Sequence, residues 1–405
     1  MSLTEPTYTV IIRGAGGDLI AFVDDYIELQ YTNVVGDVGM AKLTLAADHY
    51  LHDIIELDSL IEVKRYTSEQ ADGPEPGGGT SGAPWHIDEN DPQRDFQGAY
   101  RGDVTRYERD GRTVSEFAFP SLEEHAMRAI VAYPTGTNDR SEHTAEDLGD
   151  IVWNTLRYNL NGAESAVNTT GQGRVRAVSD FKDLYGFFDS DVTIDYANAW
   201  KSVFTCYQEL ADYAGFDPFI IWWGDQNPGG DYSIYYINGR NNGNGPLFSV
   251  PRHGTDRRSE VIFHVGAGNI EAADIDQRRI GYPTVAIVGG RGQGSDRNVV
   301  VRTSDDYVAF TNNIERFVDA RHLTTTAALE DYGDAYLEKN KYSPTIEVST
   351  MQAPGYKYGK DYFFGDDVRV RVAGQTVDVR IMSVTVTHNA QGERVTFELG
   401  RSKYI

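Results

Sequence analysis

The sequence contains little cysteine, little lysine and no long hydrophobic run. Its single cysteine, Cys206, excludes an internal disulfide bond. No apolar stretch approaches the roughly 18 residues that a membrane-spanning helix requires. Residues 1–5 have neither the basic nor the apolar region of a signal peptide. We therefore expect a soluble protein that is synthesised in the cytoplasm and has no membrane segment.

Positive charge is also scarce. Asp and Glu total 61 against 37 Lys and Arg, which gives a formal net charge of -24, and Arg outnumbers Lys by about three to one. Sequence-specific nucleic-acid binding needs a basic face, so this balance argues against it. A Lys-poor acidic surface suits a halophile, because the Debye length falls to about 3 Å at 1 M salt and self-repulsion is screened. An ordinary acidic mesophilic protein is the alternative.

The length and composition favour a β-rich protein of two or three domains. The 405 residues are 40% hydrophobic and 12% aromatic, so a large core is possible, and 25 Tyr with 41 Gly favour strands and turns. Strand patterns dominate residues 1–120 and 259–405, whereas 121–258 mixes helices and strands. The sequence therefore predicts a mainly β (α+β) fold with these three parts as domains.

Alternating apolar residues and turn signals define the expected strands. They begin within residues 7–66 and resume at Gly102. Asp110-Gly111 separates two such runs and predicts a hairpin. Residues 67–97 are rich in Gly, Pro and Asp, which predicts a long exposed loop.

Helices are expected where apolar residues recur at i, i+3, i+4 and i+7. Thr144 and Asp147 resemble an acidic form of the capping box before one such stretch, and Cys206 flanks the apolar stripe of another. The expected helices are 122–131, one that follows Asp147, 198–214, 314–321 and 325–339.

The last fifty residues predict a closing β-meander. Valines alternate with Arg369, Arg371, Asp378 and Arg380. Near Met382-Ser383 the alternation of apolar and polar residues shifts by one position, which predicts a β-bulge there. Because the four charged residues alternate with apolar ones, we expect them to form an edge that is suited to contacts between subunits.

Two motifs suggest chemistry but have simpler explanations. Gly289–Arg297 follows a predicted strand, as a phosphate-binding loop would, but it lacks the Gly-Lys-Ser/Thr ending and no clear amphipathic helix follows it. We interpret it as a Gly-rich turn between strands. His49 and His52 have an i, i+3 spacing that could hold a metal, but no further ligand cluster accompanies them, so an exposed turn explains them equally well.

Other candidate sites are also weak. Asp88, Asn90, Asp91 and Asp95 offer oxygen ligands for Ca²⁺, but the glycine and the spaced glutamate of an EF-hand are missing, which favours a solvated loop. Cys206 is interpreted as a core residue rather than a nucleophile. No Gly-x-Ser-x-Gly elbow is present, and no carboxylate pair stands out as a glycosidase pair among the 61 acidic residues. We therefore predict no catalytic, cofactor-binding or metal-binding residues.

Several stretches together resemble a known family. These stretches are Asp24-Asp25-Tyr26, Gly36-Asp37, Gly39, Val285–Arg297, Arg316–Arg321 and the Tyr-x-Tyr-Gly-Lys-Asp-Tyr-x-x-Gly-Asp-x-Val pattern of Tyr356–Val368. In them the sequence is similar to the baseplate-hub, or tail-associated (tail tip hub), proteins of long non-contractile-tailed (siphovirus-type) phages.

The resemblance implies a homotrimer whose barrel-like domains form a ring at the distal end of the tail tube. Residues 1–120 and 259–405 would be these two barrel-like tube domains, and 121–258 the mixed α/β insertion between them. The ring would adapt a six-fold tube above to three-fold parts below and let genomic DNA pass through its lumen. The implied partners are distal tail or tail-tube proteins above and tail-tip, fibre or receptor-binding proteins below. The resemblance carries over no catalytic residue and no cofactor.

We interpret the chain as a structural virion protein of the tail tip, and its acidic composition points to a haloarchaeal virus. Two alternatives from other classes stay open. One is a tail-associated glycan hydrolase that uses two of the many carboxylates. The other is a receptor- or carbohydrate-binding tail protein, which the abundant Tyr and Trp222-Trp223 would suit.

Overall fold

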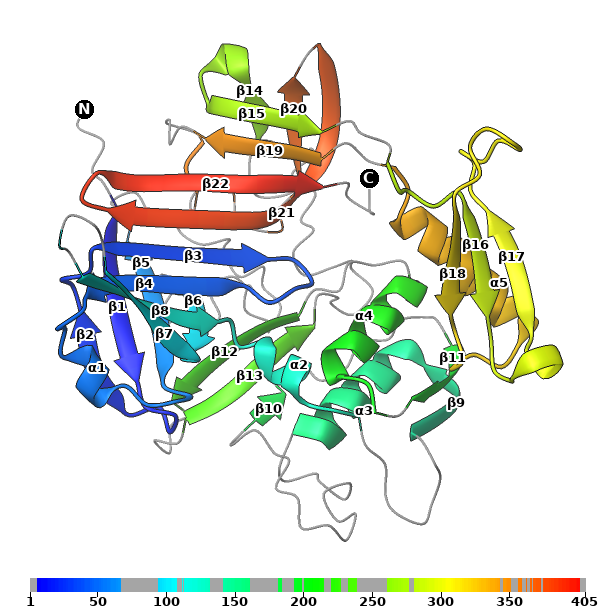
Figure 1. Ribbon diagram of the computed structural model, residues 1–405, viewed down its shortest axis with the longest axis horizontal. Helices are drawn as coiled ribbons and strands as arrows, with labels where there is room; N and C mark the ends of the chain where they lie inside the picture. Colours follow the sequence, from blue (N-terminus) through cyan, green and yellow to red (C-terminus); the bar gives the residue numbers. More distant parts are fainter. Residues whose placement is uncertain are drawn as a thin grey trace, which may run out of the picture.

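The computed structural model consists mainly of β-strands, with a smaller share of helix (Figure 1). Within the described residues, no helix is long and apolar enough to cross a membrane. The predicted mainly β, α+β fold class is confirmed. The structure describes residues 6–66, 94–107, 111, 113–131, 141–160, 181–183, 193–198, 200–214, 220–226, 232–238, 261–276, 280–342, 345–350, 356–358, 362, 365, 367–372 and 374–400.

A four-stranded sheet is built from N-terminal strands alone. Its order is β2-β1-β5-β6, and all neighbours are antiparallel. Val10, Ile12 and Val63 point inward from this sheet because side chains alternate along each strand. The elements are β1 (Thr7–Arg13), β2 (Leu19–Val23), α1 (Leu51–Ile54), β5 (Leu60–Tyr66) and β6 (Arg94–Ala99).

A longer sheet joins the two ends of the chain. Its main path is β15-β19-β22-β21-β3-β4-β8-β7, and β20 with β14 branches from β21. The hydroxyls of Thr32 in β3 and Thr385 in β21, which are 353 residues apart in the sequence, are hydrogen-bonded at 2.8 Å. Its elements are β3 (Glu28–Val34), β4 (Met40–Ala46), β7 (Gly102–Tyr107), β8 (Thr113–Pro120), β14 (Ile262–His264), β15 (Ile270–Asp276), β19 (Thr345–Thr350), β20 (Asp367–Val372), β21 (Gln375–Asn389) and β22 (Gly392–Gly400).

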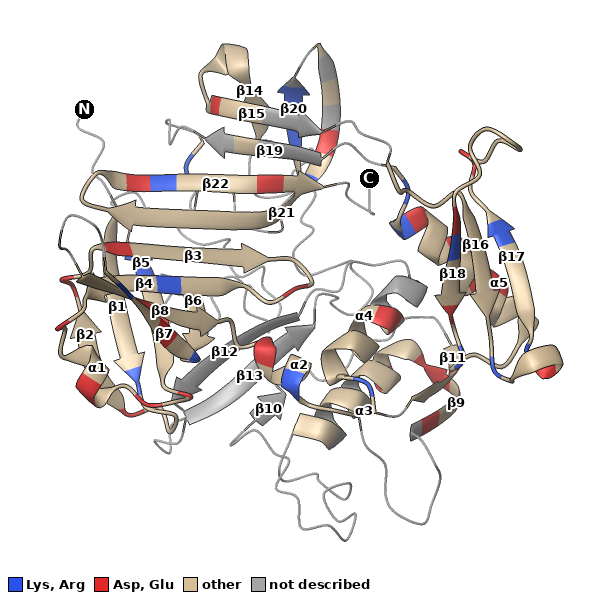
Figure 2. Ribbon diagram, in the orientation of Figure 1, with Lys and Arg blue, Asp and Glu red and all other residues tan. Residues whose placement is uncertain are grey.

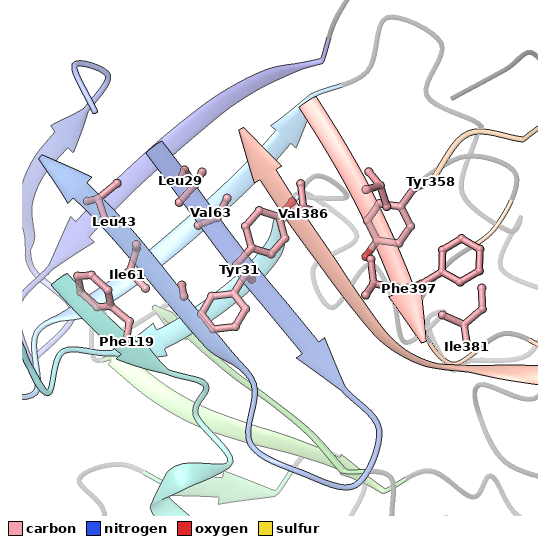
Figure 3. Packing of buried hydrophobic residues seen from close by; sticks show 14 of the residues in the cluster. Leu29, Tyr31, Leu43, Ile61, Val63, Phe119, Tyr358, Ile381, Val386 and Phe397 are labelled. Carbon is pink, nitrogen blue, oxygen red and sulfur yellow. The ribbon is translucent and has the colours of Figure 1, made fainter. Parts of the chain in front are cut away.

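One hydrophobic core lies under both sheets. Leu29, Tyr31 and Leu43 from the N-terminal strands belong to the same buried cluster as Ile381 and Phe397 from the closing meander (Figure 3). Burial of each such side chain contributes about 1.5–3 kcal/mol. The first and last parts of the chain therefore depend on each other for their stability.

The predicted division into residues 1–120, 121–258 and 259–405 stays a prediction. The structure shows that the first and third of these segments contribute strands to one sheet and side chains to one core. The two segments therefore share one sheet and one core, wherever the boundary of each predicted domain lies.

The middle of the chain has a core of its own. Helix α4 presents Val203, Cys206 and Leu210 to the buried residues of α3, so the prediction that Cys206 is a core residue is confirmed. The elements are α2 (Glu124–Arg128), β9 (Ser141–Asp147), α3 (Leu148–Leu160), β10 (Phe181–Asp183), β11 (Thr193–Asn198), α4 (Val203–Ala214), β12 (Ile220–Gln226) and β13 (Tyr232–Asn238).

Residues 280–342, which we call the lobe, form a separate small unit between β15 and β19 in the chain (Figure 1, right). Its sheet has the order β17-β16-β18, and helix α5 packs on one face of it. Gly333 permits this close packing, since a Cβ there would come within 2.8 Å of Val288 Cγ2. The elements are β16 (Val285–Gly289), β17 (Val299–Thr303), β18 (Glu315–Asp319) and α5 (Thr326–Lys339).

Several local predictions are confirmed. Strands β7 and β8 form the predicted hairpin, and Gly111 in its turn has a φ of 90°. The meander has its bulge between Ile381 and Ser383. Gly289–Arg297 connects the antiparallel strands β16 and β17, as expected for a Gly-rich turn.

Other local predictions are wrong. The segment 314–321 contains strand β18 instead of a helix, because its parallel pairing with β16 overrides the local pattern. Helix α4 begins later than predicted, and Trp200 before it has a φ of 64°. Thr144 lies in β9, so it is Asp147 that accepts a hydrogen bond from the first turn of α3, at 2.8 Å. Of the helix expected at 122–131, only the central five residues are helical, as α2.

His322 joins the lobe to the middle of the chain. Its ring lies edge-on to those of Tyr196 in β11 and Tyr332 in α5, with centroid distances of 5.2 and 5.3 Å. The side chain is buried. Burial first, and the charge of Lys201 second, lower the pKa of His322 to about 3, although Asp319 acts in the opposite direction. The imidazole is therefore neutral in the folded protein at neutral pH.

We expect His322→Phe to make the fold less sensitive to acid. In the unfolded chain the imidazole titrates near its ordinary pKa of about 6.5, whereas the folded protein takes up this proton only near pH 3. Above pH ~6.5, His322 therefore does not reduce the free energy of unfolding of the native protein. Below that pH, proton uptake by His322 in the unfolded chain lowers the free energy of unfolding by up to about 1.4 kcal/mol per pH unit. Denaturant unfolding of both proteins between pH ~7 and ~4 measures this difference, and equal slopes would contradict it.

Candidate assembly surfaces

A buried ion pair holds β5 against β22. The side chains of Arg65 and Glu393 are each 5% exposed, and Arg65 Nε lies 2.6 Å from Glu393 Oε2. Arg65 Nη2 donates to Glu393 Oε1 at 2.8 Å, and Nη1 donates to the carbonyl of Tyr358 at 2.9 Å. The Tyr8 hydroxyl also donates to Glu393. This bidentate ion pair fixes the relative orientation of the Arg65 guanidinium and the Glu393 carboxylate. The pair therefore determines how the N-terminal sheet packs against the closing meander.

Asp95 lies beside this pair, in β6, so its predicted place in an exposed acidic loop is wrong. Its carboxylate accepts hydrogen bonds from the hydroxyls of Tyr31 and Tyr358, the latter at 3.3 Å. Burial raises the pKa of Asp95, although the charge of Arg65 opposes the rise. The end of the predicted 67–97 loop is therefore part of the buried structure.

In the part of the chain that the structure describes, the main path of the long sheet has two open edges, β7 and β15, and the short strand β14 is the open edge of the branch. Strand β7 pairs with β8 alone, and β15 pairs with β19 alone. Strand β7 is exposed along most of its length, with Val104 56% and Tyr107 84% accessible. Unpaired backbone groups along an edge strand are a template for pairing with another chain. Strands β7 and β15 are therefore positions at which a second chain can extend the sheet.

The charged residues of the closing meander do not form the predicted edge. Strand β20 pairs with β21 on one side and β14 on the other, so it lies inside the sheet. Arg369 donates to Asp378 of the same hairpin at 2.7 Å, and Arg380 is 2% exposed. Of these four residues only Arg371 is exposed. Most of this charge therefore serves contacts within the chain.

The outer face of the long sheet is polar. Thr32 and Thr385 face each other there, and Gln30 donates to the Thr387 hydroxyl at 3.4 Å. Figure 2 shows charges of both signs along β22 on the same sheet. Because the opposite face is filled by the hydrophobic core, this polar face is the one that can meet solvent or another polar molecule.

The two histidines predicted as a metal candidate have different partners. His49 is buried, and its Nε2 lies 3.0 Å from Asp25 Oδ1, so the expected exposed turn is wrong for this residue. His52 instead lies 3.8 Å from Asp103. Among the residues described, no group of three or more His, Cys, Asp or Glu side chains is arranged to hold a metal ion.

The remaining candidates add no reactive group. Burial raises the pKa of Cys206 to about 12, which suits a core residue. The predicted loop residues Asp88, Asn90 and Asp91 fall outside the described residues. Trp222-Trp223 lies in β12, where the structure describes the backbone only.

The fold is that of solved phage tail proteins. A 43 kDa tail protein of prophage MuSo2 from Shewanella oneidensis matches with a TM-score of 0.58 and 11% identity, over 98% of this chain and 99% of that chain. A tail protein from Neisseria meningitidis MC58 matches with a TM-score of 0.55 and 12% identity, over 97% of this chain and 96% of that chain. At these identities the likeness shows a shared fold.

The sequence itself shows the family. Residues 9–401 match the model of the Siphovirus ReqiPepy6 Gp37-like protein family, and the chain belongs to that family. No protein with a curated description matches the sequence. The expected relation to siphovirus proteins is thus confirmed.

Arg65 and Glu393 were missed as key residues, yet the strand pattern contains a signal for both. Arg65 has the same two-residue phase as the buried Val63, and Glu393 has the same phase as the buried Val395. Side chains two apart in a strand point to the same face. If the alternation of core-facing residues in each strand is continued by one more such position, Arg65 and Glu393 both face the core. Nothing in the sequence pairs one with the other.

We expect Glu393→Ala to lower the free energy of unfolding by about 3–5 kcal/mol, because the variant leaves the buried guanidinium of Arg65 without its partner. The matched control, Asp334→Ala, removes the partner of the more exposed Arg302, with which it makes a 2.6 Å ion pair. We expect that change to have a much smaller effect on the free energy of unfolding, because solvent screens this exposed pair. Urea unfolding measures both, and equal losses would contradict a special role for the buried pair.

Proposed function

We propose that the protein is a structural tail protein of a siphovirus-type virus and forms a homotrimeric baseplate hub. The observation that carries the proposal is the long sheet, which both chain ends build and which ends in β7 on one side and β15 on the other. The shared fold with phage tail proteins over nearly the whole chain supports it.

The open edges at the two ends of the main path, β7 and β15, favour head-to-tail assembly. If β7 of one copy pairs with β15 of the next, each copy uses two different surfaces. Such heterologous contacts form a ring when the rotation between copies closes. In a ring of three, the core face of each sheet stays covered within its own copy, and the polar face around Thr32 and Thr385 is free to line the lumen. A polar lining suits the passage of DNA without recognition of its sequence.

The proposed hub lies at the distal end of the tail tube in the virion. It adapts the six-fold tube above to three-fold parts below, where tail-tip, fibre or receptor-binding proteins attach, and it has no catalytic role. The segments 1–120 and 259–405 are its barrel-like domains, and 121–258 is the insertion between them. The net charge of -24 supports a haloarchaeal virus as its source.

The mass and symmetry of the purified protein test the proposal. We expect an assembly with three times the mass of the 45.1 kDa chain and a threefold ring in averaged electron micrographs. Val104→Lys adds a charge to the open strand β7, which should weaken association about tenfold or more. Light scattering over a range of protein concentrations measures this change.

The matched control is Met127→Lys, which changes an exposed residue of α2 and should leave association unaltered. A monomer at every concentration, a six-fold ring, or a position away from the tail axis in the assembled virion would count against the hub. Equal effects of the two lysine variants would count against β7 as the contact.

A further inference from the structure

Six polar side chains meet where the four-stranded sheet packs against the closing meander. They come from β1, β3, β5, β6, β22 and the segment before β20, and they are Tyr8, Tyr31, Arg65, Asp95, Glu393 and Tyr358. We call them the Asp95 cluster. Tyr31 and Tyr358, both labelled in Figure 3, belong to the hydrophobic core. Polar groups in such surroundings must satisfy one another, because little water reaches them.

The Asp95 cluster contains one cation and two carboxylates. The Arg65 guanidinium donates to both oxygens of Glu393, at 2.6 and 2.8 Å, so these two charges balance each other. Within the described structure, both hydrogen bonds that reach the Asp95 carboxylate come from the neutral hydroxyls of Tyr31 and Tyr358. If both carboxylates are ionised, one negative charge is therefore left in excess, and it lies at Asp95.

No tyrosine of the cluster changes this balance. Burial is the main cause that raises the pKa of each of the three tyrosines well above its ordinary value, so all three are neutral donors at neutral pH. His388 is the next titratable side chain beside the cluster. Its ring lies 4.5 Å from that of Tyr8, and its Nδ1 lies 2.7 Å from the Tyr26 hydroxyl. It therefore adjoins Tyr8, whereas Asp95 bonds to the other two tyrosines.

We propose that Asp95 takes up a proton when the chain folds, and that this proton regulates how firmly the N-terminal sheet is joined to the closing meander. The proton makes the Asp95 cluster electrically neutral. Protonated Asp95 can still accept a hydrogen bond from a tyrosine, and its own O–H becomes a donor. Loss of the proton leaves a second carboxylate charge near Glu393, with only one guanidinium to balance both.

The electrostatic surroundings of Asp95 act in the same direction. Burial is the largest effect and raises its pKa, and the charge of Glu393 also raises it. The charge of Arg65 and the hydrogen bonds from Tyr31 and Tyr358 oppose the rise without cancelling it. The folded protein therefore binds this proton at a higher pH than the unfolded chain does.

The proton makes the stability of this junction depend on pH. In the unfolded chain Asp95 titrates near its ordinary pKa of about 3.9. The proton therefore stabilises the fold fully below pH ~4, and this stabilisation is lost as the pH rises through the higher pKa of the folded protein. At His322 the direction is the opposite, because burial lowers the pKa of that imidazole. A fall in pH thus strengthens the junction of the two sheets and weakens the contact between the lobe and the middle of the chain.

The variant Asp95→Asn tests the inference, because its side chain has nearly the same shape and is neutral at every pH. We divide the ratio of folded to unfolded native protein by the same ratio for the variant, so that all other titrating groups, His322 included, cancel. We expect this quotient to rise by up to about tenfold per pH unit as the pH is lowered from ~8 to ~4. Urea unfolding of both proteins measures it. A quotient that is constant, or that falls with acid, would overturn the inference.

The infrared spectrum of the native protein provides a measurement that does not require Asp95→Asn to fold. We expect the carbonyl band of a protonated carboxylic acid at pH ~5, where an ordinary aspartate is ionised. Tyr31→Phe removes a hydrogen bond that lowers the pKa of Asp95, so it should extend this band to higher pH. The matched control is Tyr50→Phe, which removes the hydroxyl that donates to the Phe22 carbonyl and should leave the titration of the band unchanged. Absence of the band at pH ~5, or equal titrations in the two tyrosine variants, would overturn the inference.

Discussion

The antiparallel pairing of β3 with β21 is the constraint on which the rest of the structure depends. It places Tyr31 opposite Val386 in the core and leaves Thr32 and Thr385 on the outer face. A slip of one residue would reverse these faces. The ion pair between Arg65 and Glu393 opposes such a slip, because both groups are buried and each is the other's main partner. Hydrophobic burial stabilises the junction, and the ion pair makes its geometry specific.

This junction also decides which strands of the long sheet are left at an open edge. Since the two chain ends meet in the middle of the long sheet, the open ends of its main path come from strands in the interior of the sequence, β7 and β15. The lobe enters the chain between β15 and β19, and α1 lies beside β7, where His52 and Asp103 are 3.8 Å apart. Both ends of the main path are thus located by one pairing between distant segments of the chain.

Local patterns predicted much of the fold, and distant contacts explain what they did not predict. The alternation in the meander, its bulge and the β7–β8 hairpin follow from neighbouring residues. Strand β18 depends on its parallel pairing with β16, which no local pattern encodes. Arg380 was expected on an exposed edge, but β21 crosses there from its pairing with β20 to its pairing with β22, and Val379, Arg380 and Ile381 are all buried. The open edge at β7 was missed for the same reason, because which strand lies at the edge of a sheet is a property of the whole fold.

In the proposed ring, the pairing of β7 with the next copy specifies its own register only weakly. The backbone hydrogen bonds of an edge strand are alike at every residue, and the exposed Asp103 and Thr105 add little discrimination. A slip of two residues would preserve those bonds while moving the next copy by about 7 Å. A ring closes only if every copy adopts the same register, so contacts outside the paired strands have to select it.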